Sequence, residues 1–241
     1  MGLFDLLKRG GTGREAGPAN VAAPTRPTAS EGCLLCGKPL VTLPSAKPLA
    51  CELCADVSPA STRCQDGHHV CDACHAAPAA EVIERTCART EERDPVALAL
   101  RLLRHPALQR RGPDHGFLVT AVLVAAWSNA SGEASRRRER VADARRRAAS
   151  EAARGGADGV GAFAGIAGDA ALADRMSARA RAIVGDAGAG RCCKRESILS
   201  VLAAAKLTRE HLHVELPSRG VGCETSGRSK DCEGSGCPFN R

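Results

Sequence analysis

The pattern of hydrophobic and polar residues is most regular between residues 91 and 206, where it predicts several helices. Residues 117–130 form an apolar run that is shorter than the roughly 20 residues a membrane span requires, so a buried core helix is expected there. Asp94 followed by Pro95 is typical of a helix start. The helix that begins there is expected to end before His105-Pro106, because a residue preceding proline disfavours the helical conformation.

Three more helices are predicted downstream. Residues 134–154 have a polar helical pattern with a narrow alanine and valine seam, Asp169 is a plausible cap for the next helix, and a last helix is expected from about residue 192 to 206. Between them, residues 155–168 are rich in glycine. No strand precedes this segment and no Gly-Lys-Ser/Thr follows it, so close helix packing or a loop beside a ligand is favoured over a phosphate loop.

The N-terminal part of the chain differs in composition. Residues 10–30 are rich in Gly, Pro, Ala and Thr and are expected to be a flexible linker. We therefore predict a flexible segment at 1–30, a metal-binding cysteine module at 31–90 and a helical domain at 91–241. The expected fold is mainly α, with a zinc-ribbon-like or treble-clef-like module containing short strands, followed by a helical domain with a cysteine-rich C-terminal tail.

Cysteine usage adds chemistry to this picture. The 241 residues include 13 cysteines but only five aromatic side chains and no tyrosine. The first residues lack the pattern of a secretory signal, so the expected compartment is the cytoplasm. In a reducing compartment, so many thiols are expected to be metal ligands or redox groups rather than disulfides.

The first cysteine cluster has the spacing of a double metal site. Pairs of ligands separated by two or three residues place both donor atoms on one side of a tight turn, and eight ligands suit two tetrahedral ions, zinc being favoured over iron. The pairing stays open: the ligand pairs could be used sequentially, or first with third and second with fourth in a cross-braced manner. His68 is preferred to His69 and His75 because of its spacing to Cys71, and Cys87 is expected to be a core thiol. The predicted ligands are Cys33, Cys36, Cys51, Cys54, Cys64, His68, Cys71 and Cys74.

A second cluster lies near the C-terminus. Its five cysteines could hold a third zinc ion or an iron–sulfur cluster. Alternatively, the adjacent pair at the expected helix start could act as redox nucleophiles in a thiol enzyme, with Asp114 or His115 as proton-transfer partner. The residues of this cluster are Cys192, Cys193, Cys223, Cys232 and Cys237.

Charge is distributed unevenly along the chain. Residues 31–90 carry five basic and seven acidic side chains, and two zinc ions on seven thiolates would bring this module to a net charge near −5, which disfavours contact with phosphates. Residues 134–154 carry eight arginines and three acids. This segment is a solvated helix face, which is favoured, or the nucleic-acid-binding surface of a zinc-finger regulatory protein. Because no aromatic residues interleave with the arginines, a stacking platform for single-stranded nucleic acid is disfavoured.

Several motifs together resemble those of an uncharacterised, cysteine-rich domain-of-unknown-function family of methanogens and anaerobic bacteria. The resemblance covers about residues 32–239 and rests on the motifs at 33–37, 64–75, 112–115, 191–195 and 236–239. Some relatives look fused to S-adenosylmethionine-dependent methyltransferases. The resemblance implies an accessory role in anaerobic redox, metal or methyl-transfer metabolism, with a methyltransferase or a redox protein as partner. Relatives are expected to have cysteines in the glycine-rich segment, and this chain has none at 159–168.

Overall fold

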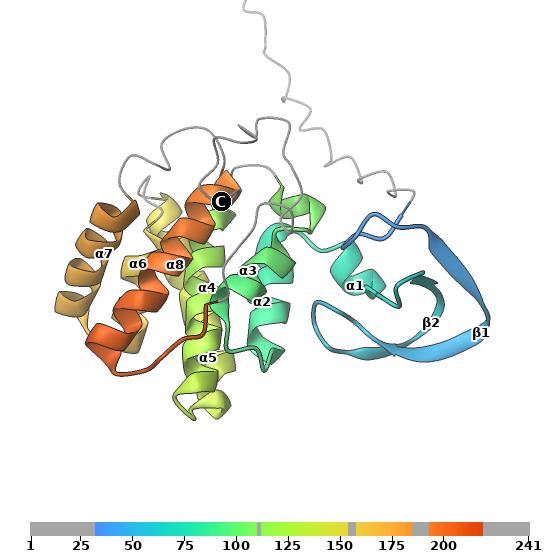
Figure 1. The fold of residues 1–241 in the computed structure, drawn as a ribbon, viewed down its shortest axis with the longest axis horizontal. Helices are drawn as coiled ribbons and strands as arrows, with labels where there is room; N and C mark the ends of the chain where they lie inside the picture. The colour runs from blue at the N-terminus through green and yellow to red at the C-terminus, as the bar shows by residue number, and fades with distance from the viewer. Residues whose placement is uncertain (1–31, 110–111, 154–157, 185–192, 219–241) are drawn as a thin grey trace, which may run out of the picture. The chain divides into compact units, whose positions relative to one another are not determined.

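The computed structural model describes residues 32–109, 112–153, 158–184 and 193–218. The chain separates into two units, Met1–Ser30 and Glu31–Arg241. Within the described residues, the second unit is mainly helical, with a small two-stranded sheet near its N-terminal end (Figure 1). The predicted fold class is therefore confirmed.

The sheet is an antiparallel hairpin of β1 (Leu40–Ala50) and β2 (Val57–Cys64). Leu40 lies opposite Cys64 at one end, and Ala50 lies opposite Val57 at the other end, next to the turn. The register shifts between Thr42 and Lys47, where β1 has more residues than β2. A two-stranded sheet consists only of edge strands, which is why it can accommodate the prolines in both of its strands. After β2 the chain forms a single helical turn, α1 (Asp72–His75).

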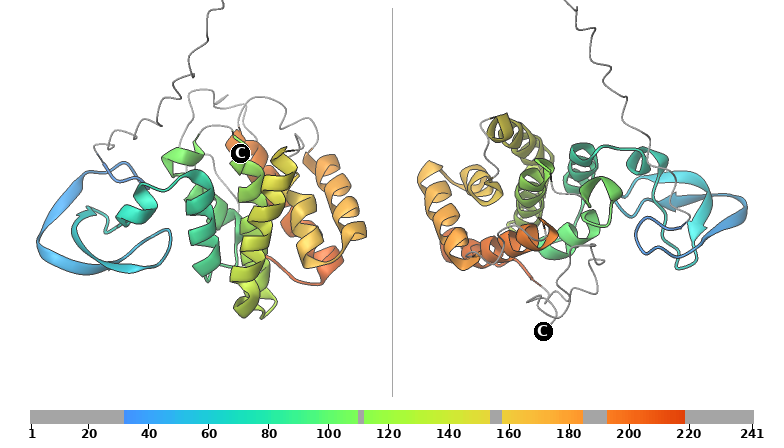
Figure 2. Two further views of the ribbon diagram at one scale, coloured as in Figure 1. Left: turned by 180° about the vertical axis from the view of Figure 1, so that it is seen from behind. Right: turned by 90° about the horizontal axis from the view of Figure 1, so that it is seen from above.

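The helical part is arranged around α4 (Asp114–Ala130) (Figure 2). Five helices contact α4 directly, and α7 packs on two of them, α6 and α8. Short 3₁₀ turns lie at Pro106–Leu108 and Ala134–Arg136. The surrounding helices are α2 (Ala79–Arg89), α3 (Pro95–Leu102), α5 (Arg137–Ala153), α6 (Gly159–Ala167), α7 (Ala170–Val184) and α8 (Cys193–Leu212).

Helix α4 is the buried helix that the apolar run predicts. Nearly all of its side chains are buried, because neighbouring helices cover it on most sides. The indole of Trp127 meets the ring of Phe163 from α6 edge to face, with ring centroids 6.3 Å apart. Because aromatic residues are scarce, this core consists mainly of Leu, Val and Ala side chains, together with the ring pair between α4 and α6. Across the described residues, no helix combines the length and apolarity that crossing a membrane requires.

The predicted helix starts are confirmed by their caps. The Asp94 carboxylate accepts hydrogen bonds from the backbone N–H groups of Val96 and Ala97 at 2.9 and 3.0 Å. At the start of α7, Asp169 accepts one from the N–H of Leu172 at 2.7 Å. These carboxylates satisfy donors that the first helical turn leaves without an intrahelical partner.

Helix α8 is longer than its expected end near residue 206. It continues to Leu212 because Leu207 and Thr208 still face the core and no helix-breaking residue intervenes. The backbone leaves the helical conformation at His213, whose φ of 55° is left-handed.

Within the glycine-rich segment, Gly159–Ala167 form α6, and the first residue of this helix, Gly159, lies against α4. A Cβ added at Gly159 would lie 2.6 Å from the carbonyl oxygen of Gly116 and 2.7 Å from Cβ of Val119. The Thr120 hydroxyl lies 3.0 Å from the carbonyl oxygens of both Gly116 and Gly159. Close helix packing therefore explains the glycine at this position.

Candidate metal centre

Two Cys-x-x-Cys turns frame β1 and have the same backbone geometry. In the first, the N–H of Gly37 donates to the carbonyl of Cys33 at 2.7 Å. In the second, the N–H of Ala55 donates to the carbonyl of Cys51 at 2.9 Å. Gly37 and Ala55 both have positive φ, 74° and 60°, which folds the chain back after the second cysteine. Both turns thus place their two sulfurs on one side.

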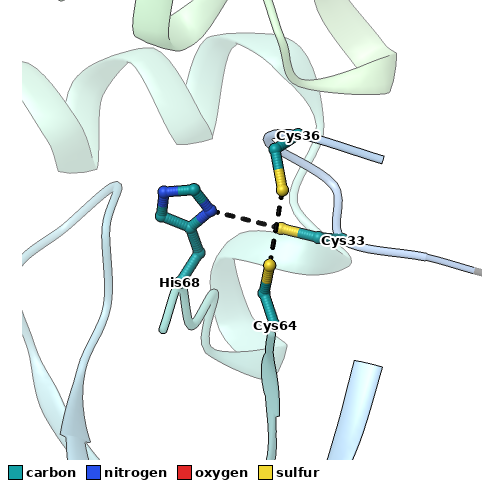
Figure 3. Close-up of side chains that lie close together, drawn as sticks. All are labelled: Cys33, Cys36, Cys64 and His68. Carbon is teal, nitrogen blue, oxygen red and sulfur yellow. Dashed lines mark hydrogen bonds between the residues drawn. The ribbon is translucent and has the colours of Figure 1, made fainter. Parts of the chain in front are cut away.

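The hairpin register decides which ligands meet. Because Leu40 pairs with Cys64, the turn that precedes β1 lies beside the residues that follow β2. The ligand atoms of this first set all lie within 4.8 Å of one another and could hold one metal ion (Figure 3). The sulfurs of Cys36 and Cys64 are 3.3 Å apart, and that of Cys33 is 3.8 Å from Nδ1 of His68. We call this set group 1: Cys33, Cys36, Cys64 and His68.

The remaining four ligands gather at the opposite end of the hairpin. The second turn connects β1 to β2 there, and the chain after His68 runs back to it, where the N–H of Glu52 donates to the carbonyl of His69 at 2.8 Å. The sulfurs of Cys54 and Cys71 are 3.8 Å apart, which matches the roughly 3.8 Å edge of a tetrahedron with Zn–S bonds of about 2.3 Å. This set could also hold one ion. We call it group 2: Cys51, Cys54, Cys71 and Cys74.

The arrangement is therefore cross-braced, with the first ligand pair beside the third and the second beside the fourth. Between the two pairings that the spacing left open, the structure selects this one, because an antiparallel hairpin separates its turn from its ends. The eight predicted ligands are those that come together. Of the competing histidines, His75 is exposed, and Nε2 of His69 is buried without a hydrogen-bond partner among the described residues.

The thiols of group 2 influence one another strongly. A hydrogen bond with Cys74 lowers the pKa of Cys51 to about 4, and backbone N–H groups act in the same direction. Burial raises the pKa of Cys54 to about 11. The pKa of Cys74 is also raised, first by its hydrogen bond to Cys51 and then by burial. In the absence of a cation, four buried sulfurs cannot all be ionised, so this group requires a positive charge at its centre to hold four thiolates.

Two contacts connect group 2 to the helical part of the protein. Nδ1 of His105 accepts a hydrogen bond from the N–H of Ala107 at 3.2 Å, so Nε2 carries the proton and donates to the carbonyl of Cys74 at 3.0 Å. Asp56, next to the second turn, forms an ion pair with Arg89 of α2, which lowers the pKa of the Asp56 carboxyl. The second ligand set is thus braced by the helices.

Cys87 lies apart from both groups, near the C-terminal end of α2. It is fully buried, and burial raises the pKa of its thiol. A neutral side chain in an apolar environment fits the predicted core thiol.

The C-terminal cysteines lie outside the residues whose side chains are described, so the third metal site, the iron–sulfur cluster and the redox pair stay predictions. Of the two residues predicted as proton-transfer partners, Asp114 lies in the first turn of α4 and is partly buried. His115 is buried, and its Nδ1 lies 3.0 Å from the hydroxyl of Ser197 in α8. Ser197 follows Cys193, the first residue of α8, by four positions.

Most arginines of α5 and its preceding turn have partners within the protein. The guanidinium of Arg140 lies over the Trp127 ring, 4.3 Å from its centroid, and pairs with Glu133 at 2.8 Å. Five more pair with carboxylates or donate to a backbone carbonyl or an amide oxygen. These arginines are Arg136, Arg137, Arg145, Arg146 and Arg147.

No curated protein and no solved structure matches the chain. One family profile does match, over residues 83–240. The match begins within α2, later than the residue 32 expected from the motif resemblance, so the eight ligands of groups 1 and 2 precede it. Because it covers well over half of the chain, the protein belongs to this family, a family of unknown function (DUF5714).

Proposed function

We propose that the protein binds two zinc ions in the cross-braced module, one in group 1 and one in group 2. The observation that carries this proposal is that eight soft or borderline ligands form two separate sets of four, each within 4.8 Å. All cysteines of both sets are free thiols, so they are available as ligands. Sets of Cys₃His and Cys₄ are those that structural zinc sites use, and tetrahedral thiolate sites exclude hard cations such as Mg²⁺.

The zinc ions have a structural task in this module. The hairpin between the two groups is largely exposed and buries few apolar side chains. Metal binding then supplies much of the folding free energy that packing does not supply.

The wider role is that of a cytoplasmic accessory protein in anaerobic redox, metal or methyl-transfer metabolism, with a methyltransferase or redox protein as partner. This part of the proposal is supported by the motif resemblance and by free thiols at all eight described cysteines. The C-terminal cysteines fall within the range that matches the family, and we propose that they hold a third zinc ion or an iron–sulfur cluster. These residues are Cys192, Cys193, Cys223, Cys232 and Cys237.

The test is metal and sulfide quantification on the full chain purified without oxygen, together with paired substitutions. The expected result is at least two zinc ions per chain. Substituting Cys36 and Cys64 together to serine should remove one ion, because both serve group 1. Substituting Cys36 and Cys54 together should remove two, because each then damages a different group.

Sequential pairing would reverse this result, since Cys36 and Cys54 would then serve one ion. Fewer than two bound ions in the unsubstituted chain would contradict the proposal itself. A variant with Cys87→Ala is the matched control, because this thiol belongs to neither group and its loss should leave the zinc content unchanged. Iron and sulfide bound in addition to the two zinc ions would support a C-terminal iron–sulfur cluster.

A further inference from the structure

Groups 1 and 2 differ in how far their ligands are accessible to solvent. In group 2 every sulfur-bearing residue is buried, and Cys54 and Cys74 are 0% exposed. In group 1, Cys36 is exposed and His68 is only partly buried. An incoming ligand can therefore reach an ion in group 1 from the side of Cys36, whereas protein surrounds the ligands of group 2.

The groups also differ in charge. One zinc ion with four thiolates has a net charge of −2, whereas one with three thiolates and a neutral imidazole has −1. Both groups have a basic side chain nearby. The pKa of Arg89 is raised first by Asp56 and further by the charges of Cys54 and Cys74, and the pKa of Lys38 is raised first by Asp66 and further by those of Cys36 and Cys64. A nearby cation therefore does not distinguish the groups, and the difference in charge is the one at the zinc centres.

The supports of the two groups are unequal as well. Group 2 is tied to the helices by the His105 hydrogen bond to the carbonyl of Cys74 and by the Asp56–Arg89 ion pair. Beside group 1, the ion pair is that of Lys38 with Asp66, at 2.9 Å. The side chains of both ion pairs are about half exposed, and such surface pairs contribute little to stability, so the buried hydrogen bond of His105 is the support that distinguishes group 2. Opening the turn around Cys36 is thus opposed by less structure than opening group 2.

We infer that group 1 is an exchangeable zinc centre, which passes its ion to thiol-bearing metal acceptors through Cys36, while the ion of group 2 stays in place. This inference rests on the proposed zinc binding and assigns different tasks to the two ions. In the exchange step, the bond between zinc and the Cys36 sulfur breaks and a bond between zinc and the acceptor sulfur forms. The proton of the incoming thiol moves to the released Cys36 thiolate. The same exchange at Cys33 and Cys64, and last at His68, whose imidazole takes the fourth proton, frees the ion from the protein, and no step requires an oxidant or a reductant.

Isotope exchange on the full chain tests this inference. Protein loaded with ⁶⁴Zn is mixed with an excess of the ⁶⁸Zn complex of glutathione, and native mass spectrometry follows the mass of the zinc-bound chain. We expect one ion to exchange at least roughly ten-fold faster than the other. Equal rates for both ions, or exchange of neither ion over a day, would overturn the inference. Protein that carries no zinc at the start would instead contradict the proposed function.

Two double variants assign the fast ion to its group. The chain with Cys54→Ser and Cys71→Ser keeps group 1 and should show only the fast phase. The chain with Cys36→Ser and Cys64→Ser keeps group 2 and should show only the slow phase; the opposite assignment would refute the inference. If a variant does not fold, brief alkylation of the unsubstituted protein with iodoacetamide during exchange gives the same information. Cys36 should then be the first modified ligand, and first modification at Cys54 or Cys74 would refute it.

Discussion

At the scale of single residues, the same side chain has different chemistry in different places. Cys36 is exposed, Cys51 is stabilised as a thiolate, and Cys87 is buried and neutral. Sequence spacing separates the ligands from Cys87, because Cys87 has no partner two or three residues away. Burial and neighbouring donors then determine how reactive each thiol is.

Cys87 is predicted to be unreactive in the folded protein. N-ethylmaleimide should leave it unmodified at pH 8 and modify it after unfolding in denaturant, as read by peptide mass spectrometry. Its thiol has a pKa above the ordinary value of 9.0 in the folded state. The unfolded chain therefore loses this proton first, and the stability that Cys87 contributes falls as the pH rises above about 9.

The control for this pH effect is Cys87→Ala, whose stability should decline less steeply above pH 9 than that of the unsubstituted protein. Equal modification of Cys87 in the folded and unfolded states would contradict its assignment to the core.

At the scale of elements, the fold depends on a few positions where a side chain would clash with a neighbouring element or where the backbone adopts a left-handed φ. The two Cys-x-x-Cys turns require positive φ after the second cysteine, and the crossing of α4 and α6 requires a glycine. For the glycine-rich segment the sequence favours close helix packing or a loop beside a ligand, and at Gly159 the structure shows packing against α4. Ala55 has the same left-handed geometry as Gly37 without being a glycine.

The geometry of these turns predicts opposite effects for two substitutions, one in each turn. Gly37→Ala should cost roughly 1 kcal/mol, because a Cβ at left-handed φ is strained even though no atom lies near it. The zinc affinity of group 1, measured by chelator competition, should then fall about five-fold. Ala55→Gly should leave the zinc affinity of group 2 unchanged or raise it, and a large loss would show that Ala55 is not strained.

Helix α6 predicts a contrast between two glycines. Alanine normally stabilises a helix by about 1 kcal/mol relative to glycine. Gly159→Ala should nevertheless destabilise the protein by about 2 kcal/mol, because its Cβ would collide with the backbone of α4. Gly165→Ala is the matched control: the nearest atom to its Cβ is the end of the flexible Arg147 side chain at 3.2 Å, so little or no loss is expected. Urea unfolding distinguishes the two, and equal effects would contradict the close crossing.

At the scale of the whole molecule, group 2 is the part of the cysteine module that contacts the helices. The hydrogen bond from His105 and the ion pair of Arg89 connect this group to the helical part, so disorder in the group is expected to destabilise the helices. Burial lowers the pKa of His105, so its ring stays neutral and keeps its two hydrogen bonds. Trp127, the one tryptophan of the chain, lies in the helical core and reports on its unfolding.

Loss of the two groups should therefore affect the helices unequally. The double variant Cys54→Ser/Cys71→Ser should lower the Tm read from Trp127 fluorescence by roughly 5 °C or more, which corresponds to about 2 kcal/mol for a domain of this size. The variant Cys36→Ser/Cys64→Ser should lower it by no more than about 2 °C. The reverse order would contradict the role of group 2 as the link, and His105→Ala should reproduce part of the larger effect.

The sequence by itself predicted the eight residues that gather into two sets, the helix starts and the buried α4. These features are local: ligand spacing, capping residues such as Asp94 and a continuous apolar run are read within a few turns of chain. It did not determine where α8 ends, because Leu207 and Thr208 are retained in the helix by packing against other elements.

Only the tertiary structure decided which of the eight predicted ligands come together in one set of four that could hold an ion. That choice depends on the register of β1 on β2, in which Leu40 lies opposite Cys64 and the second turn lies at the far end. Spacing along the chain is compatible with either pairing, since it does not record how the hairpin folds back. The different exposure of the two groups has the same origin: group 2 lies where His105 and Arg89 reach it, and Cys36 of group 1 stays open to solvent.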